Sequence, residues 1–100
     1  MQQIRRGTTP TIHFTTTLQQ SSVDTIYITF EQGGQTKVEK TGADVEWDST
    51  GLSVSLSQED TLSFSAGLLN VQIRARLNTL ATATQILSLM VEPVLKSGVI

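Results

Sequence analysis

The chain has 100 residues, a formal net charge of −2, 38% hydrophobic residues and no cysteine. This length fits one domain that can bury a core unaided, and the absence of cysteine excludes disulfides and thiolate metal sites. Seven basic residues against nine acidic ones exclude the basic surface of a general nucleic-acid binder, and no stretch approaches the roughly 18 apolar residues of a membrane span.

Residues 1–10 are expected to form an extended N-terminal arm ahead of a single domain over residues 11–100. Ile4 is the only large apolar residue after the first position. Arg5 and Arg6 either are solvated or dock on an acidic partner surface. No apolar run follows these basic residues, so we expect no secretory signal. We expect the chain to be synthesised in the cytoplasm.

Four segments before Gly51 alternate between apolar and polar residues, which is the period of half-buried strands. They span residues 11–18, 25–32, 36–40 and 44–48. Gly33 and Gly34 predict a hairpin between the second and third segments, because both positions accept positive φ. His13 falls on a polar face without a second histidine, which favours a surface residue over a metal ligand or a catalytic base.

Residues 52–77 contain a strand at 52–56, a helical turn, and the longest alternation of the chain at 69–77. Ser57, with Asp60 three residues later, predicts a capping box. An alternative role for the carboxylates of Glu59 and Asp60 is an acid–base pair. Capping of the helical turn explains these two residues better. In the last segment Leu69 to Leu77 alternate inward, which leaves Arg74 and Arg76 facing solvent or a partner.

The last predicted strand, residues 84–92, is partly apolar on both faces. One face should be core and the other exposed or covered by a partner subunit. The two sets are Leu87, Leu89 and Val91 against Ile86, Ser88 and Met90. Residues 80–83 are ambiguous and could begin this strand early.

About seven strands, with turn signals every 8–12 residues or so, predict an all-β fold: an antiparallel immunoglobulin-like β-sandwich. The short helical turn would cross between its sheets. A small barrel is the alternative architecture.

One histidine and no cysteine cannot build a nucleophile–base triad or a zinc site of ordinary ligands. The scattered acids would hold a cation only by chance convergence. We therefore expect no enzyme activity, no catalytic or metal site and no cofactor.

Three stretches carry a family resemblance: IRRGTTPTIHF, VSLSQEDTLSFSAG followed by VQIRARL, and VEPVLKSGVI. They resemble small proteins that tailed phages and prophages of Gram-positive bacteria encode among their tail and baseplate genes. They are also similar to the N-terminal immunoglobulin-like domain of upper baseplate proteins. The resemblance implies a structural or assembly protein of the virion tail, made in the host bacterial cytoplasm. Its partners would be other tail or baseplate proteins or a second copy in a homo-oligomer, without nucleic acid or membrane.

The candidate partner contacts are the four arginines and the second face of the last strand. They are Arg5, Arg6, Arg74, Arg76, Ile86 and Met90. The alternative function is a host-surface or carbohydrate-binding module with Trp47 and Tyr27 as its platform, and burial of Trp47 in the core would argue against it.

Overall fold

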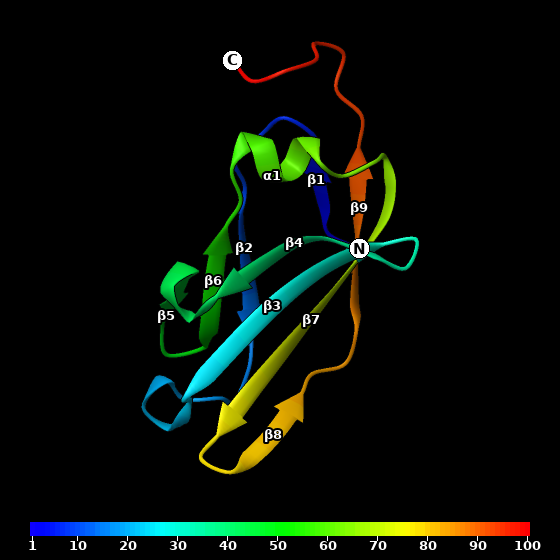
Figure 1. The fold of residues 1–100 in the computed structure, drawn as a ribbon. Helices are drawn as coiled ribbons and strands as arrows, with labels where there is room; N and C mark the ends of the chain where they lie inside the picture. Colours follow the sequence, from blue (N-terminus) through cyan, green and yellow to red (C-terminus); the bar gives the residue numbers. More distant parts are fainter.

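Two β-sheets share one hydrophobic core in the computed structural model, which describes residues 1–100 (Figure 1). The strands are β1 (Gln3–Arg5), β2 (Thr11–Thr15), β3 (Thr25–Gln32), β4 (Gln35–Thr41), β5 (Val45–Trp47), β6 (Gly51–Ser55), β7 (Gly67–Leu77), β8 (Leu80–Ala83) and β9 (Leu87–Glu92). The helices are α1 (Gln58–Leu62) and two 3-10 turns, η1 (Gln20–Ser22) and η2 (Gly42–Asp44). The prediction of an all-β fold is confirmed. No helix is long and apolar enough to cross a membrane.

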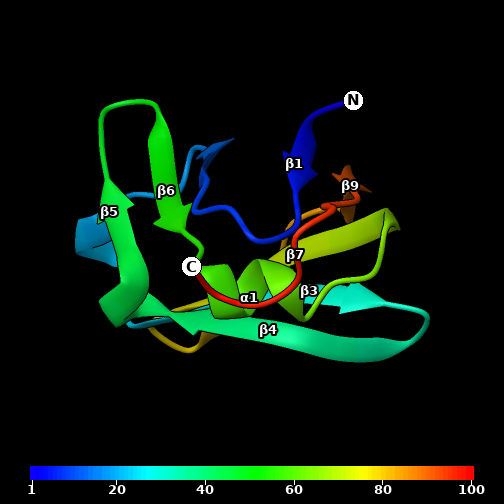
Figure 2. The same ribbon diagram turned by 90° about the horizontal axis from the view of Figure 1, so that it is seen from above.

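The larger sheet has six strands in the order β1-β9-β7-β3-β4, with β8 also paired to β7, and the smaller has the order β2-β6-β5. All pairs are antiparallel except β1 with β9, so the expectation of wholly antiparallel sheets is wrong at this pair. Seen from above, β5 and β6 lie in one layer and β4, β3 and β7 in the other, with α1 between them at one end (Figure 2). The helical turn therefore crosses between the sheets as predicted, because β6 and β7 belong to different sheets.

The longest strand, β7, is the centre of the larger sheet. Its inward residues Leu69, Val71, Ile73 and Ala75 are all buried, as the alternation predicts. β3 pairs along one side of β7, while β9 and β8 lie end to end along the other. Thr84 joins these two strands: its N–H donates to the Ile73 carbonyl (2.9 Å) and its hydroxyl accepts from the Ile73 N–H (3.1 Å). The predicted strand 84–92 consequently begins at Leu87.

The first ten residues, for which we expected an arm outside the domain, contain the edge strand β1. Ile4 lies opposite Val91 in the sheet and is buried in the core. The Arg6 N–H extends the pairing by donating to the Glu92 carbonyl (3.1 Å). An apolar side chain in an extended segment gains more free energy in the core than in water, and this burial holds the segment in the sheet.

The strand expected at 11–18 ends at Thr15, because the Thr16 hydroxyl accepts a hydrogen bond from the Leu18 N–H (3.2 Å) and turns the chain. The predicted capping box is confirmed at α1. The Ser57 hydroxyl accepts from the Asp60 N–H (3.0 Å), and the Asp60 carboxylate accepts from the Ser57 N–H (2.9 Å). This local device starts a helix too short to be stable alone.

Candidate functional site

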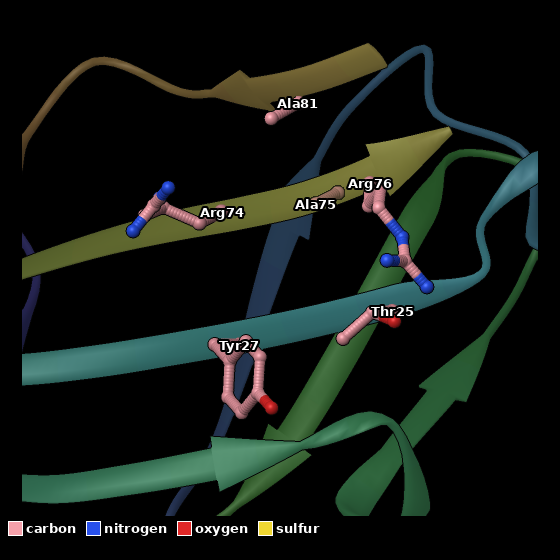
Figure 3. Close-up of a pocket in the computed structure, with 6 residues that line it drawn as sticks. All are labelled: Thr25, Tyr27, Arg74, Ala75, Arg76 and Ala81. Atoms are coloured by element: carbon pink, nitrogen blue, oxygen red, sulfur yellow. The ribbon is translucent and has the colours of Figure 1, made fainter. Parts of the chain in front are cut away.

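The outer face of the six-stranded sheet carries the candidate site, at the end where β7 finishes. A shallow hollow of about 230 Å³ is lined there by side chains of β3, β7 and β8 (Figure 3). Cross-strand register explains this grouping, because Tyr27 lies opposite Arg74 and Thr25 lies opposite Arg76. The strict alternation of β7 turns both arginines outward while their neighbours Ile73 and Ala75 face the core.

Arg74 and Arg76 are two cations of this face without an ion pair. The ion pairs of the chain join His13 to Asp48 and Lys40 to Asp60, and no side-chain hydrogen bond involves either arginine. Figure 3 shows the Arg76 side chain reaching from β7 towards Thr25 on β3. An unpaired guanidinium in a hollow can bind a carboxylate or phosphate with two parallel hydrogen bonds. The hollow is therefore suited to an anionic group.

Exposed apolar side chains continue this face along the sheet. Ile86, 63% exposed, lines a second hollow of about 170 Å³ together with residues of β3 and β7. Met90 is half-buried and alternates with the buried Leu89 and Val91, so it also faces outward. Leu87 was grouped with the core face, but it is 47% exposed because it begins β9 at the margin of the core.

Sequence reasoning left one apolar residue of this face out. Leu68 is 55% exposed and lies opposite Met90 on β9. Leu68 and Arg74 are an even number of residues apart in β7, so the alternation of the strand places them on the same side. This spacing could have identified Leu68 from the sequence. Arg74, Arg76, Ile86 and Met90 are therefore brought to one face of the sheet, with Leu68 beside Met90.

Arg5 and Arg6 lie at the other end of the larger sheet from Arg74 and Arg76 and do not line their hollow. Arg5 donates to the Pro93 carbonyl (2.6 Å) from an exposed position. Arg6 is half-buried and donates to the Leu62 carbonyl (3.1 Å) at the end of α1, while its Nε is buried without a partner. Arg6 therefore fastens the N-terminal segment to the helix.

Trp47 and Tyr27 lie on different sheets, so they do not form one platform. Tyr27 is 43% exposed on the outer face of the larger sheet. Trp47 is half-buried and packs against the core from the smaller sheet. It also borders an open depression of about 630 Å³, lined mostly by polar residues at positions 16–20, 48 and 49.

His13, Asp48 and Thr50 form a polar cluster on the smaller sheet. His13 Nε2 lies 3.1 Å from both Asp48 Oδ2 and Thr50 Oγ1. A Ser/Thr–His–Asp relay needs the two partners on different ring nitrogens, and here both meet the same one. Hydrogen bonds from the Thr50 hydroxyl and N–H lower the pKa of Asp48, and the hydrogen bond from the Gly51 N–H has a smaller effect in the same direction. Desolvation acts in the opposite direction and does not outweigh them. The cluster therefore fastens the turn before β6.

Asp60 is held by contacts that stabilise its ionised form. Partial burial raises the pKa of this carboxyl, but hydrogen bonds from Lys40 and Ser57 and the Lys40 charge outweigh it, so the net pKa is lowered. The Lys40 Nζ lies 2.8 Å from Asp60 Oδ2 and ties α1 to β4. No group of three or more histidine and acidic residues is arranged to hold a metal ion. The acid–base alternative for Glu59 and Asp60 has no geometric support, since Asp60 is engaged in capping and in the ion pair.

Comparison with known proteins found no matching family model, no matching curated protein and no matching solved structure.

Proposed function

We propose that the chain is a non-enzymatic structural or assembly protein of a phage or prophage tail and baseplate region, which acts by protein–protein contacts. Such a protein would be made in the host bacterial cytoplasm and carried in the tail of the virion. The resemblance of the three stretches supports this role, and the outer face of the larger sheet supports its mode of action.

The proposed architecture is an immunoglobulin-like sandwich. In that fold the second, fifth and fourth strands form one sheet, and the third, sixth and seventh form the other. If β2 is taken as the second strand, then β2-β6-β5 reproduces the first order and β4-β3-β7-β9 the second, with the added strand of variable-type domains. The chain departs from that family's antibody members in having no cysteine and no tryptophan on β3.

The observation that carries the proposed mode of action is the pair of unpaired arginines beside exposed apolar residues. Interfaces are enriched in arginine and tyrosine, and unpaired charges at a rim steer the encounter of oppositely charged surfaces. Arg74, Arg76 and Tyr27 are placed together in this way, with Ile86 and Leu68 further along the face. The partner surface should therefore be acidic with apolar neighbours.

The test is a binding measurement between the purified chain and the purified tail and baseplate proteins encoded beside it. Replacing both arginines (Arg74→Glu with Arg76→Glu) should weaken the contact at least about 10-fold and reduce its salt dependence. Lys96→Glu is the matched control, because this exposed lysine lies in the C-terminal segment outside both sheets. If the wild-type chain binds none of these proteins, the proposed mode of action is wrong.

A second candidate, a host-surface or carbohydrate-binding module, is favoured by one observation. The open depression beside Trp47 combines an aromatic side chain with hydroxyl, amide and carboxylate groups, and small-molecule sites have this mixture. Titration of the Trp47 fluorescence with host cell-wall polysaccharide tests it. A change that saturates, and that Gln20→Ala weakens, would favour this candidate over the structural role.

A further inference from the structure

The strand β2 is an edge of the three-stranded sheet and pairs with β6 alone. In Figure 2 it lies on the opposite side of β6 from β5. An edge strand presents a row of unpaired N–H and C=O groups, which another strand can meet.

The register shows which groups of β2 are unpaired. Just beyond the two ends of the strand, the Leu56 N–H donates to the Pro10 carbonyl (2.9 Å) and the Thr16 N–H donates to the Thr50 carbonyl (3.1 Å). Antiparallel pairing alternates, so even-numbered residues point their backbone groups at β6 and odd-numbered ones point away. Thr11, His13 and Thr15 therefore direct their N–H and C=O groups to the open edge. No hydrogen bond outside the β2–β6 ladder uses these groups.

Three of the other edges of the two sheets carry protection that β2 lacks, and the fourth, β8, pairs only with β7, has no charged residue and is four residues long. β4 contains Lys37, Glu39 and Lys40 and has a register irregularity opposite β3. β1 and β5 are only three residues long, and each has a charged side chain. Charges, bulges and short length discourage pairing between edges. β2 has five residues with no charged acid or base, no proline and no bulge.

We propose that β2 pairs in antiparallel fashion with β2 of a second copy of this chain, about a two-fold axis that lies midway between the two His13 residues. The strand reads Thr-Ile-His-Phe-Thr, which is a palindrome in side-chain type. In this register Thr11 meets Thr15 of the second copy, and His13 meets His13. All the unpaired backbone groups of both strands then form hydrogen bonds, and the two small sheets become one continuous sheet.

The side chains of β2 fit this register on both faces. On the outer face, threonine meets threonine, which is a favourable cross-strand pair. On the inner face Ile12 meets Phe14 of the second copy, so the buried rows of the two cores align. The His13 ring contacts the Asp48 carboxylate and the Thr50 hydroxyl of its own chain, which hold it in place. The pattern of the strand thus favours a second copy over an unrelated strand.

This pairing goes beyond the proposed function, because it uses an edge of the smaller sheet and not the arginine face of the larger one. The two ideas can therefore fail separately. Edge pairing alone buries less than a standard interface, so the dimer should be weak and its population should depend on concentration.

The first experiment measures amide hydrogen exchange and sedimentation of the wild-type chain from micromolar to millimolar concentration. We expect a monomer–dimer equilibrium, with the amides of Thr11, His13 and Thr15 exchanging more slowly as the dimer fraction rises. The amides of Ile12 and Phe14, already paired to β6, should not change. A monomer at millimolar concentration, or slow exchange of the three edge amides in the monomer, overturns the proposal.

The second experiment compares three variants. Thr15→Pro removes an edge N–H without touching the ladder to β6, and symmetry doubles the loss, so dimerisation should weaken at least about 30-fold. His13→Lys places two ammonium groups opposite each other and serves if the proline variant does not fold. Ser53→Lys is the matched control: it adds the same charge directly opposite His13 on β6, away from the edge, and should dimerise like the wild type. A dimer that persists in the folded edge variants overturns the proposal.

Discussion

The two sheets differ in how many of their strands have a neighbouring strand on both sides. In the larger sheet β3, β7 and β9 each have neighbours on both sides, and the strands of this sheet contribute 11 of the 17 residues buried in the core. In the smaller sheet only β6 is flanked by two strands. The larger sheet should therefore provide most of the stability, while the smaller one can accept a further strand at its edge with little rearrangement.

Their outer faces differ in chemistry as well. The larger sheet exposes unpaired arginines and apolar side chains, whereas His13 and Asp48 of the smaller sheet contact each other. One sheet is suited to contacts through side chains, the other to contacts through backbone groups at an edge. The difference suggests two separate surfaces for association, which mutations can test one at a time.

The largest difference in stability between the two sheets is expected when one core phenylalanine in each is truncated. Phe30 is fully buried on β3 with its ring centroid 6.0 Å from that of Phe64. Phe14 is almost as buried, but lies on the edge strand β2. We expect Phe30→Ala to cost about 4 kcal/mol and Phe14→Ala about 3 kcal/mol of unfolding free energy, because the edge can relax around the cavity. Urea denaturation measures both, and an equal or larger loss for Phe14→Ala contradicts the ranking.

Gly51 in the smaller sheet and Gly67 in the larger one differ in how much stability an added side chain should cost. Gly51 begins β6 at φ 157°, and a Cβ there would overlap the Phe14 carbonyl oxygen of β2. Gly67 begins β7 at φ 126°, with no atom within 4 Å of a Cβ. We expect Gly67→Ala to cost about 1 kcal/mol from strain alone and Gly51→Ala about 3 kcal/mol from strain plus the clash. Similar denaturation midpoints for the two variants would show that β2 moves aside easily.

The predictions from sequence succeeded where the signal is local. The alternation from Leu69 to Leu77 identified the inward residues of β7, and the spacing of Ser57 and Asp60 identified the start of α1. Both signals lie within a few residues and depend on side-chain period or on one capping contact.

The features that the sequence did not reveal depend on contacts between distant residues. Ile4 gave no sign that β1 pairs in parallel with β9, more than 80 residues later. The break between β8 and β9 is set by Thr84 bonding to Ile73, and a threonine in a threonine-rich chain carries no such signal. The separation of Arg6 from Arg74 likewise follows from topology, because Arg6 meets the end of α1 while Arg74 lies far along β7. Whether arginines from different segments share a site is therefore known only after the strands are placed.

The smallest expected effect is a loss of unfolding free energy at low pH. It should differ between Asp48, at the smaller sheet, and Asp60, which contacts Lys40 of the larger sheet. The pKa values of Asp48 and Asp60 are both lowered in the folded chain from 3.8. The folded state therefore binds fewer protons than the unfolded state near that pH. The stability that these groups contribute is present above pH 3.8 and is lost as the pH falls through their lower folded values.

We expect the unfolding free energy of the wild type to decline below that pH, and Asp60→Asn to flatten the decline more than Asp48→Asn. Asp60 is largely shielded from solvent and meets Lys40, whereas Asp48 is half exposed, so solvent weakens its interactions more. Urea denaturation at neutral pH and at pH values below 3.8 measures the difference. A wild-type slope retained in Asp60→Asn would mean that the link between α1 and β4 does not depend on the charge of this carboxylate, and that the packing of α1 against the larger sheet holds it in place.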